Sequence, residues 1–287
     1  MTATGIGERD RGGRRSRLLP RPALLAAILL AAALVTWIVA AERMRGMDAG
    51  PGTDLGGLGW YVGMWATMMA AMMLPSVAPF ALLFARVARG RSERGGAYVS
   101  PWIFLSGYLS AWLLYGLAAY GIFRAIAAAD WGFLSWEAQG PIVAGAAIAA
   151  AGLYQLTPLK DVCLRHCRSP LHFLAHGWRD GRAGAVRMGL EHGLFCVGCC
   201  AGLMVVLFAL GVMSLVWMGV VAAVIFAEKV LPRGDRARRP LAVLLVGLGL
   251  WVAIAPGSVP GLTQPNDPGA PMMRMEEMSS AASGPRR

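Results

Sequence analysis

Every cysteine and every histidine of this chain lies in one short window. The five cysteines and four histidines all fall between Cys163 and Cys200 of the 287 residues. A single buried cysteine is most often a small packing residue, but nine thiol and imidazole side chains gathered together indicate a site. Thiolate is a soft ligand and imidazole a borderline one, so the cluster predicts a bound Cu(I), Zn(II) or iron–sulfur centre.

The first group of candidate ligands contains Cys163, His166 and Cys167. Spacings of three and four residues place these side chains on one face of a helix. His172 and His176 follow at a spacing of four residues. That spacing suits either two imidazole ligands of one ion or two ordinary histidines at the membrane interface.

The second group contains His192, Cys196, Cys199 and Cys200. On a helix these positions span an arc of about 100°, so the four donors share one stripe. Cys196 and Cys199 also form a Cys-x-x-Cys pair, which could cycle between dithiol and disulfide. The two groups together offer more donors than one ion requires.

A methionine stripe precedes both groups along the chain. Met64, Met68 and Met72 repeat every four residues and therefore share one helix face. Thioethers bind Cu(I) well and Zn(II) poorly, so the stripe favours Cu(I) and a copper path through the membrane. Methionine is also a common packing residue, and ordinary core packing is the alternative.

Two carboxylates accompany the cysteine and histidine groups in apolar surroundings. Glu191 precedes His192, and Glu228 precedes Lys229. Acidic residues in membrane segments are costly, so we expect each either to orient a metal-binding histidine or, for Glu228, to pair with its lysine neighbour.

The composition decides the class of protein that must position these residues. Apolar residues make up 56% of the chain and charged residues 15%, which predicts an integral membrane protein. The net charge of +11 comes from Lys and Arg in short segments between apolar runs, so nucleic-acid binding is not expected. A bilayer core requires about 20 mostly apolar residues per helix, and seven stretches qualify. They cover residues 22–41, 60–85, 101–123, 141–157, 188–210, 213–228 and 240–256.

The sequence therefore predicts an all-α, polytopic bundle of about seven transmembrane helices over residues 22–256. Most of the 27 Lys and Arg residues lie in alternate connecting segments, which predicts a cytoplasmic N-terminus and an outer C-terminus in a bacterial inner membrane. Residues 1–21 form a basic cytoplasmic tail, residues 158–187 a cytoplasmic Cys/His loop, and residues 257–287 a disordered outer tail. A cleaved signal is the alternative for the first apolar stretch.

Three runs of the sequence occur together in one known family. They are Met-Trp-x-x-Met-Met-Ala-x-Met-Met-x-Pro from Met64, Tyr-Gln-Leu-Thr-Pro-Leu-Lys from Tyr154, and His-Gly-x-x-Cys-x-Gly-Cys-Cys from His192. Over residues 60–232 the chain resembles the DUF2182 family of bacterial predicted metal-binding integral membrane proteins. The resemblance implies a membrane protein that binds metal.

Metal handling is the function that these patterns favour. The chain would carry Cu(I) between the methionine stripe and the Cys/His cluster, as a transporter or a membrane-embedded chaperone, and could exchange it with a soluble metal carrier on the cytoplasmic side. A thiol–disulfide redox relay and an assembly factor with structural zinc are the alternatives. The sequence contains no hydrolase triad, phosphate loop or nucleotide fingerprint, so ordinary soluble-type catalysis is not expected.

Overall fold

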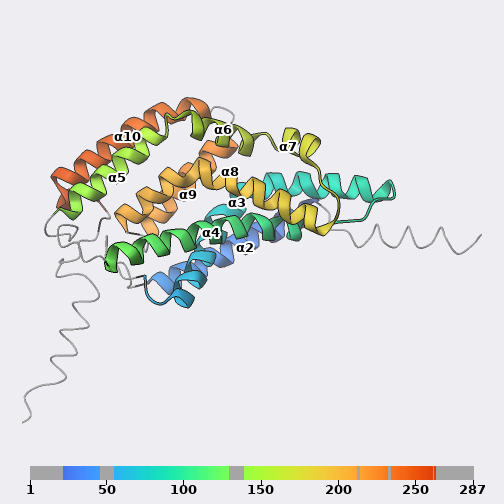
Figure 1. The fold of residues 1–287 in the computed structure, drawn as a ribbon, viewed down its shortest axis with the longest axis horizontal. Coiled ribbons are helices and arrows are strands. Elements are labelled where there is room, and N and C mark those ends of the chain that lie inside the picture. The colour runs from blue at the N-terminus through green and yellow to red at the C-terminus, as the bar shows by residue number, and fades with distance from the viewer. Residues whose placement is uncertain are drawn as a thin grey trace, which may run out of the picture.

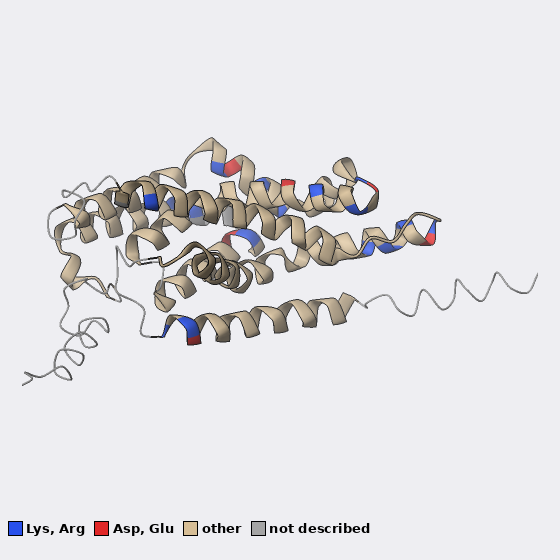
Figure 2. Ribbon diagram, turned by 60° about the horizontal axis from the view of Figure 1, so that its bottom comes forward, with Lys and Arg blue, Asp and Glu red and all other residues tan. Residues whose placement is uncertain are grey.

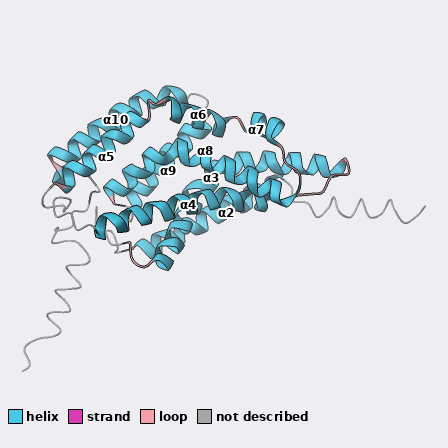
Figure 3. Ribbon diagram, in the orientation of Figure 1, coloured by secondary structure: helices cyan, strands magenta, loops and turns pink. Residues whose placement is uncertain are grey.

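The structure is a computed structural model that describes residues 22–45, 55–128, 139–211, 214–231, 234–260 and 262. The basic segment expected at 1–21 and most of the tail expected at 257–287 lie outside the described residues. Regular structure in the described part is entirely helical (Figure 3), as the composition predicted.

The helices follow the expected apolar stretches closely. Prolines open several of them, including Pro101, Pro158 and Pro170, because the first helical position needs no backbone N–H donor. The order is α2 Pro22–Met44, α3 Leu58–Glu93, α4 Pro101–Ala128, α5 Gly140–Tyr154, α6 Pro158–Arg168, α7 Pro170–Gly177, α8 Gly181–Leu210, α9 Leu215–Val230 and α10 Gly234–Ile254, followed by the short 3₁₀ helix η2 Pro256–Ser258.

Four of these helices are long and apolar enough to cross a membrane. They are α2, α3, α8 and the Pro101–Ile126 part of α4. A fifth crossing results if α5 and α6, which meet at a bend of 63°, form one broken span. Figure 2 shows long helix segments with few charged residues and a gathering of charge where α3 ends and α8 begins. Helices long and apolar enough to cross a membrane are thus shown for part of the expected bundle, and the count of seven stays a prediction.

Helix α8 occupies the centre of the bundle (Figure 1) and packs against α4, α5, α6 and α9. Its contact with α4 is close because glycines face backbone on both sides. A Cβ atom at Gly189 would overlap the carbonyl oxygen of Phe104, and one at Gly107 would overlap that of Val186. Small residues allow membrane helices to approach in this way, and the approach holds the first half of α8 in place.

Helices α5 and α10 form a second close pair along one side of the bundle (Figure 1). Gly145 and Gly249 each lie against the backbone of the opposite helix. At the end of α5 the chain turns sharply, and the Thr157 side chain accepts a hydrogen bond of 3.3 Å from the Lys160 backbone N–H, which caps α6. The turn brings α6 onto α8.

The close α4–α8 contact predicts opposite effects of two glycine substitutions. Gly189→Ala should lower the free energy of unfolding by about 1–3 kcal/mol, because the added methyl group must push two backbones apart. Gly121→Ala, where a Cβ atom meets nothing within 4 Å, should raise it by up to about 1 kcal/mol through helix propensity. Thermal unfolding in detergent measures both, and equal effects would contradict the packing described here.

Candidate metal centre

Three cysteines of α8 bring their sulfur atoms together inside the bundle. The Sγ atoms of Cys196, Cys199 and Cys200 all lie within 4.8 Å of one another, and their residues are 0%, 1% and 1% exposed. Spacings of one, three and four residues on a helix account for this convergence. Cys199 and Cys200 have sulfurs 3.4 Å apart, and the Cys199 thiol donates to the Cys196 carbonyl oxygen at 3.2 Å.

A fourth sulfur comes from α6. The Cys167 Sγ atom lies 3.8 Å from the Cys199 Sγ atom, so the first and second groups of the sequence do meet. Sulfurs of a four-coordinate site with 2.3 Å bonds are ~3.8 Å apart, so this separation suits a shared ion.

Cys163 belongs to the surroundings of this cluster. It is 6% exposed, and its sulfur lies against Gly198, where a Cβ atom would approach it to 2.7 Å. The Tyr154 hydroxyl donates to the Gly198 carbonyl oxygen at 2.6 Å on the same stretch of α8. Gly198 therefore leaves the room that α6 needs in order to dock beside the cysteines, and its carbonyl oxygen binds the end of α5.

Two polar groups from other helices reach the Cys196 sulfur. The Lys229 Nζ atom of α9 donates to it at 2.9 Å, and the Tyr108 hydroxyl of α4 lies 3.0 Å away. An ammonium group at this distance favours a thiolate, which is the form that binds metal. The cluster thus has a built-in counter-charge.

Glu228 does not pair with Lys229, the neighbouring lysine in the sequence. Its carboxylate pairs with Lys160 of α6, with Nζ and Oε2 2.7 Å apart and both side chains at most 3% exposed. Lys229 turns instead to Cys196. The pair joins α6 to α9 and so fixes the position of Cys167 relative to Lys229.

Both candidate histidines lie beside the sulfur cluster in aromatic surroundings. The His192 ring is 3.9 Å from that of Phe80, and the His166 ring is 3.8 Å from that of Phe195. His192 is 4% exposed. Glu191 does not orient it, because that carboxylate pairs with Arg179 and Arg187.

The methionines of α3 are buried, and Met64, Met68 and Met72 are each at most 3% exposed. Two ring contacts show how α3 and α8 are aligned along their lengths. Trp65 near the start of α3 stacks on Phe208 near the end of α8, and Phe80 further along α3 lies against His192. The helices therefore run in opposite directions, and Met72 lies near the level of Cys200.

Helical spacing from the same two rings predicts which methionines turn toward α8. Met69 is four residues after Trp65 and eleven before Phe80, so it shares the face of both rings. Met73 is seven residues before Phe80 and shares that face too. Met64 is turned away from Trp65 by about 100°. Met64, Met68 and Met72 stay a prediction as copper ligands, and Met69 and Met73 join them as candidates.

Sequence reasoning missed three residues of this site. Lys160 and Lys229 carried a usable signal, since each is a charged residue at the edge of an apolar stretch. Tyr108 carried none, because an interfacial or packing tyrosine in α4 has the same sequence context.

A family model described as PpoB2, copper chaperone, matches residues 62–252, about two thirds of the chain. The chain therefore belongs to this family. The match confirms the expected relation to metal, under a different family name from the one that the motifs resemble. No curated protein and no solved structure matches the chain.

The buried ion pair predicts a strong effect of removing one partner. Glu228→Gln should lower the free energy of unfolding by about 3–5 kcal/mol, because the Lys160 ammonium then stays buried without a counter-charge. The double variant Lys160→Met/Glu228→Leu should recover much of that loss. Glu42→Gln is the control, since its exposed partner Arg45 makes the pair worth about 0–1 kcal/mol. Thermal unfolding in detergent compares the three, and a Glu228→Gln variant as stable as the control would contradict this role.

Proposed function

We propose that this member of the copper chaperone family binds Cu(I) at the buried cysteines of α8 and passes it on at the level of the membrane. The observation that carries the proposal is the convergence of the Cys196, Cys199 and Cys200 sulfurs within 4.8 Å. The matching family is described as a copper chaperone, which supports the same ion.

The charges around the cluster suit a monovalent soft ion. Cu(I) bound by two thiolates has a net charge of one minus, which the Lys229 ammonium beside Cys196 offsets. A buried site requires such compensation because charges are costly to remove from water. Cys167 offers a further thiolate at 3.8 Å from Cys199, through which the ion can enter or leave by ligand exchange.

The chain would do this as a multi-pass protein of a bacterial inner membrane, with seven spans and a cytoplasmic N-terminus. The cysteines would then lie toward the cytoplasmic half and the methionines of α3 toward the outer half. Met73 and Met69 continue from the level of the cysteines along α3, and thioethers suit Cu(I). A copper path across the membrane would follow this line.

A soluble metal carrier in the cytoplasm is the partner that this arrangement favours. Charged residues gather at the end of the bundle where α3 ends and α8 begins (Figure 2), and α7, which follows the helix of Cys167, contacts α3. Such a carrier could give Cu(I) to Cys167 or take it from that residue.

One distance favours a second candidate function. Cys167 and Cys199 could form a disulfide between α6 and α8 after a small shift of their side chains, since their sulfurs are 3.8 Å apart. Oxidation of the two thiols would release two protons and two electrons to an electron acceptor in the membrane. A thiol–disulfide relay would use this pair rather than Cys196 and Cys199.

Metal content tests the proposal directly. Protein purified in detergent without oxygen should hold about one copper ion per chain by mass spectrometry, and Cys199→Ala/Cys200→Ala should lose it. Cys163→Ala is the matched control and should keep the copper, since its sulfur packs against Gly198 outside the trio. Zinc that resists chelators would indicate a structural site instead. Paired oxidation of Cys167 and Cys199 in metal-free protein would favour the redox relay.

The methionines that face α8 predict a transport phenotype. Met69→Leu/Met73→Leu should leave the equilibrium copper content unchanged but slow the release of Cu(I) across reconstituted vesicles by about tenfold, because two thioether ligands are removed while packing volume is kept. Met44→Leu, equally buried at the end of α2, is the control. If the double variant released Cu(I) at the wild-type rate, these methionines would serve only as packing residues.

A further inference from the structure

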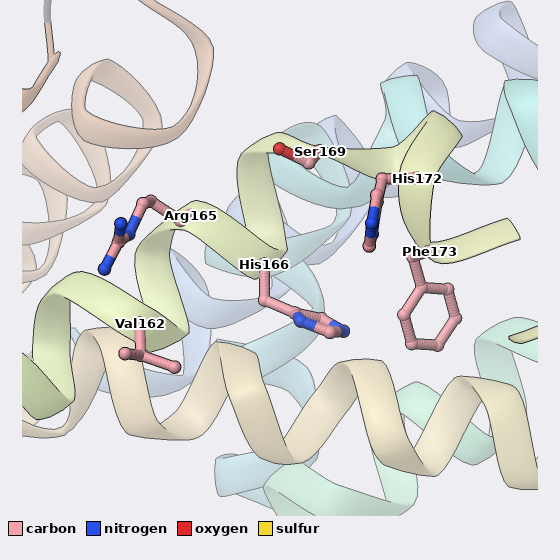
Figure 4. A pocket seen from close by; sticks show the side chains of 6 residues that line it. All are labelled: Val162, Arg165, His166, Ser169, His172 and Phe173. Carbon is pink, nitrogen blue, oxygen red and sulfur yellow. The ribbon is translucent and has the colours of Figure 1, made fainter. Parts of the chain in front are cut away.

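A separate cavity lies between α6 and α7, outside the sulfur cluster. It has a volume of about 450 Å³ and is lined by Val162, Arg165, His166, Ser169, His172 and Phe173. Figure 4 shows the rings of His166 and His172 extending into the space between the two helices. Two imidazoles thus line one cavity.

The His166 ring is oriented but not satisfied. It stacks on Phe195 at 3.8 Å and meets the edge of Phe173 at 5.1 Å, which fixes its plane. Its Nε2 atom is buried and has no hydrogen-bond partner in the part of the chain that the structure describes. A buried polar atom without a partner costs about 1–3 kcal/mol, so this nitrogen is suited to a ligand that supplies the missing bond.

His172 is held next to a third imidazole. Its ring lies 4.5 Å from that of His176, and the His176 Nδ1 atom is 3.1 Å from the His172 carbonyl oxygen. A carbonyl oxygen can only accept, so Nδ1 of His176 donates its proton there. His176 itself does not line the cavity.

Helix α6 links the cavity to the sulfur cluster, because it lines the cavity with His166 and supplies Cys167 to the cluster. Cys167 follows His166 on α6 and points to Cys199, with the sulfurs 3.8 Å apart. Phe195, on which the His166 ring stacks, precedes Cys196 on α8. An ion held by His166 would therefore have a thiol of the cluster as its next available ligand.

We propose that this cavity is an outer Cu(I) site, in which His166 and His172 hold the ion before Cys167 takes it to the buried cysteines. The inference rests on the proposed function and identifies where Cu(I) enters the protein. In the transfer a Cu–N bond breaks as a Cu–S bond forms, and the thiol proton of Cys167 passes to the released imidazole. The direction follows from the ligands, because thiolate is softer than imidazole and binds Cu(I) more tightly.

Loading kinetics test the outer site. The full-length protein in detergent is mixed without oxygen with Cu(I) held by bicinchoninate, and the loss of the coloured complex is followed by stopped flow. With one equivalent of Cu(I) per chain, His166→Phe/His172→Phe should load about tenfold more slowly than wild type but should take up the same amount of copper. His176→Phe is the matched control, because it is the same substitution on the helix of His172 but outside the cavity lining. It should load at the wild-type rate.

A second measurement detects the site without the inner one. In Cys196→Ser/Cys199→Ser/Cys200→Ser protein, X-ray absorption should show Cu(I) with nitrogen ligands, and adding His166→Phe should abolish this binding. Wild-type loading by the double histidine variant, or no nitrogen-bound copper here, would overturn the outer site while leaving the buried centre intact. Absence of copper from the wild-type protein would instead overturn the proposed function itself.

Discussion

The ion pair between Lys160 and Glu228 is the interaction on which the site depends. Both groups are almost fully buried, and neither could remain charged there alone. Their pairing ties the short helix α6 to α9 across the face of α8. Because Lys229 follows Glu228 and Cys167 lies two turns after Lys160, one pair sets the position of both a counter-charge and a fourth sulfur.

Close backbone packing supplies the rest of the framework. Glycines on α4 and α8 let these helices approach until backbone faces backbone, and Tyr108 of α4 thereby reaches the Cys196 sulfur. Gly198 does the same for α6, since it leaves space for Cys163. Glycine at these positions contributes to the metal centre through the distances that it permits, although none of them can bind an ion.

The ligand types form a sequence from the surface inward. Imidazoles line the cavity between α6 and α7, thiols form the buried cluster, and thioethers lie along α3 near the level of Cys200 and beyond. Imidazole is a borderline ligand, whereas thiolate and thioether are soft. A Cu(I) ion could pass along such a series by exchanging ligands one at a time, without ever being a bare charge in a low-dielectric interior.

The amino-acid sequence was enough to predict the class of protein and the residue types of its candidate site. Apolar stretches predicted α2, α3, α4 and α8 as membrane helices, because hydropathy over about 20 residues is a local property. Helical spacing likewise predicted that Cys196, Cys199 and Cys200 share a face. The folded arrangement was needed to show which groups meet from different helices, such as Lys229 with Cys196, Lys160 with Glu228, and Cys167 with Cys199. These contacts depend on the bend between α5 and α6 and on the register of packed helices, which no local pattern encodes.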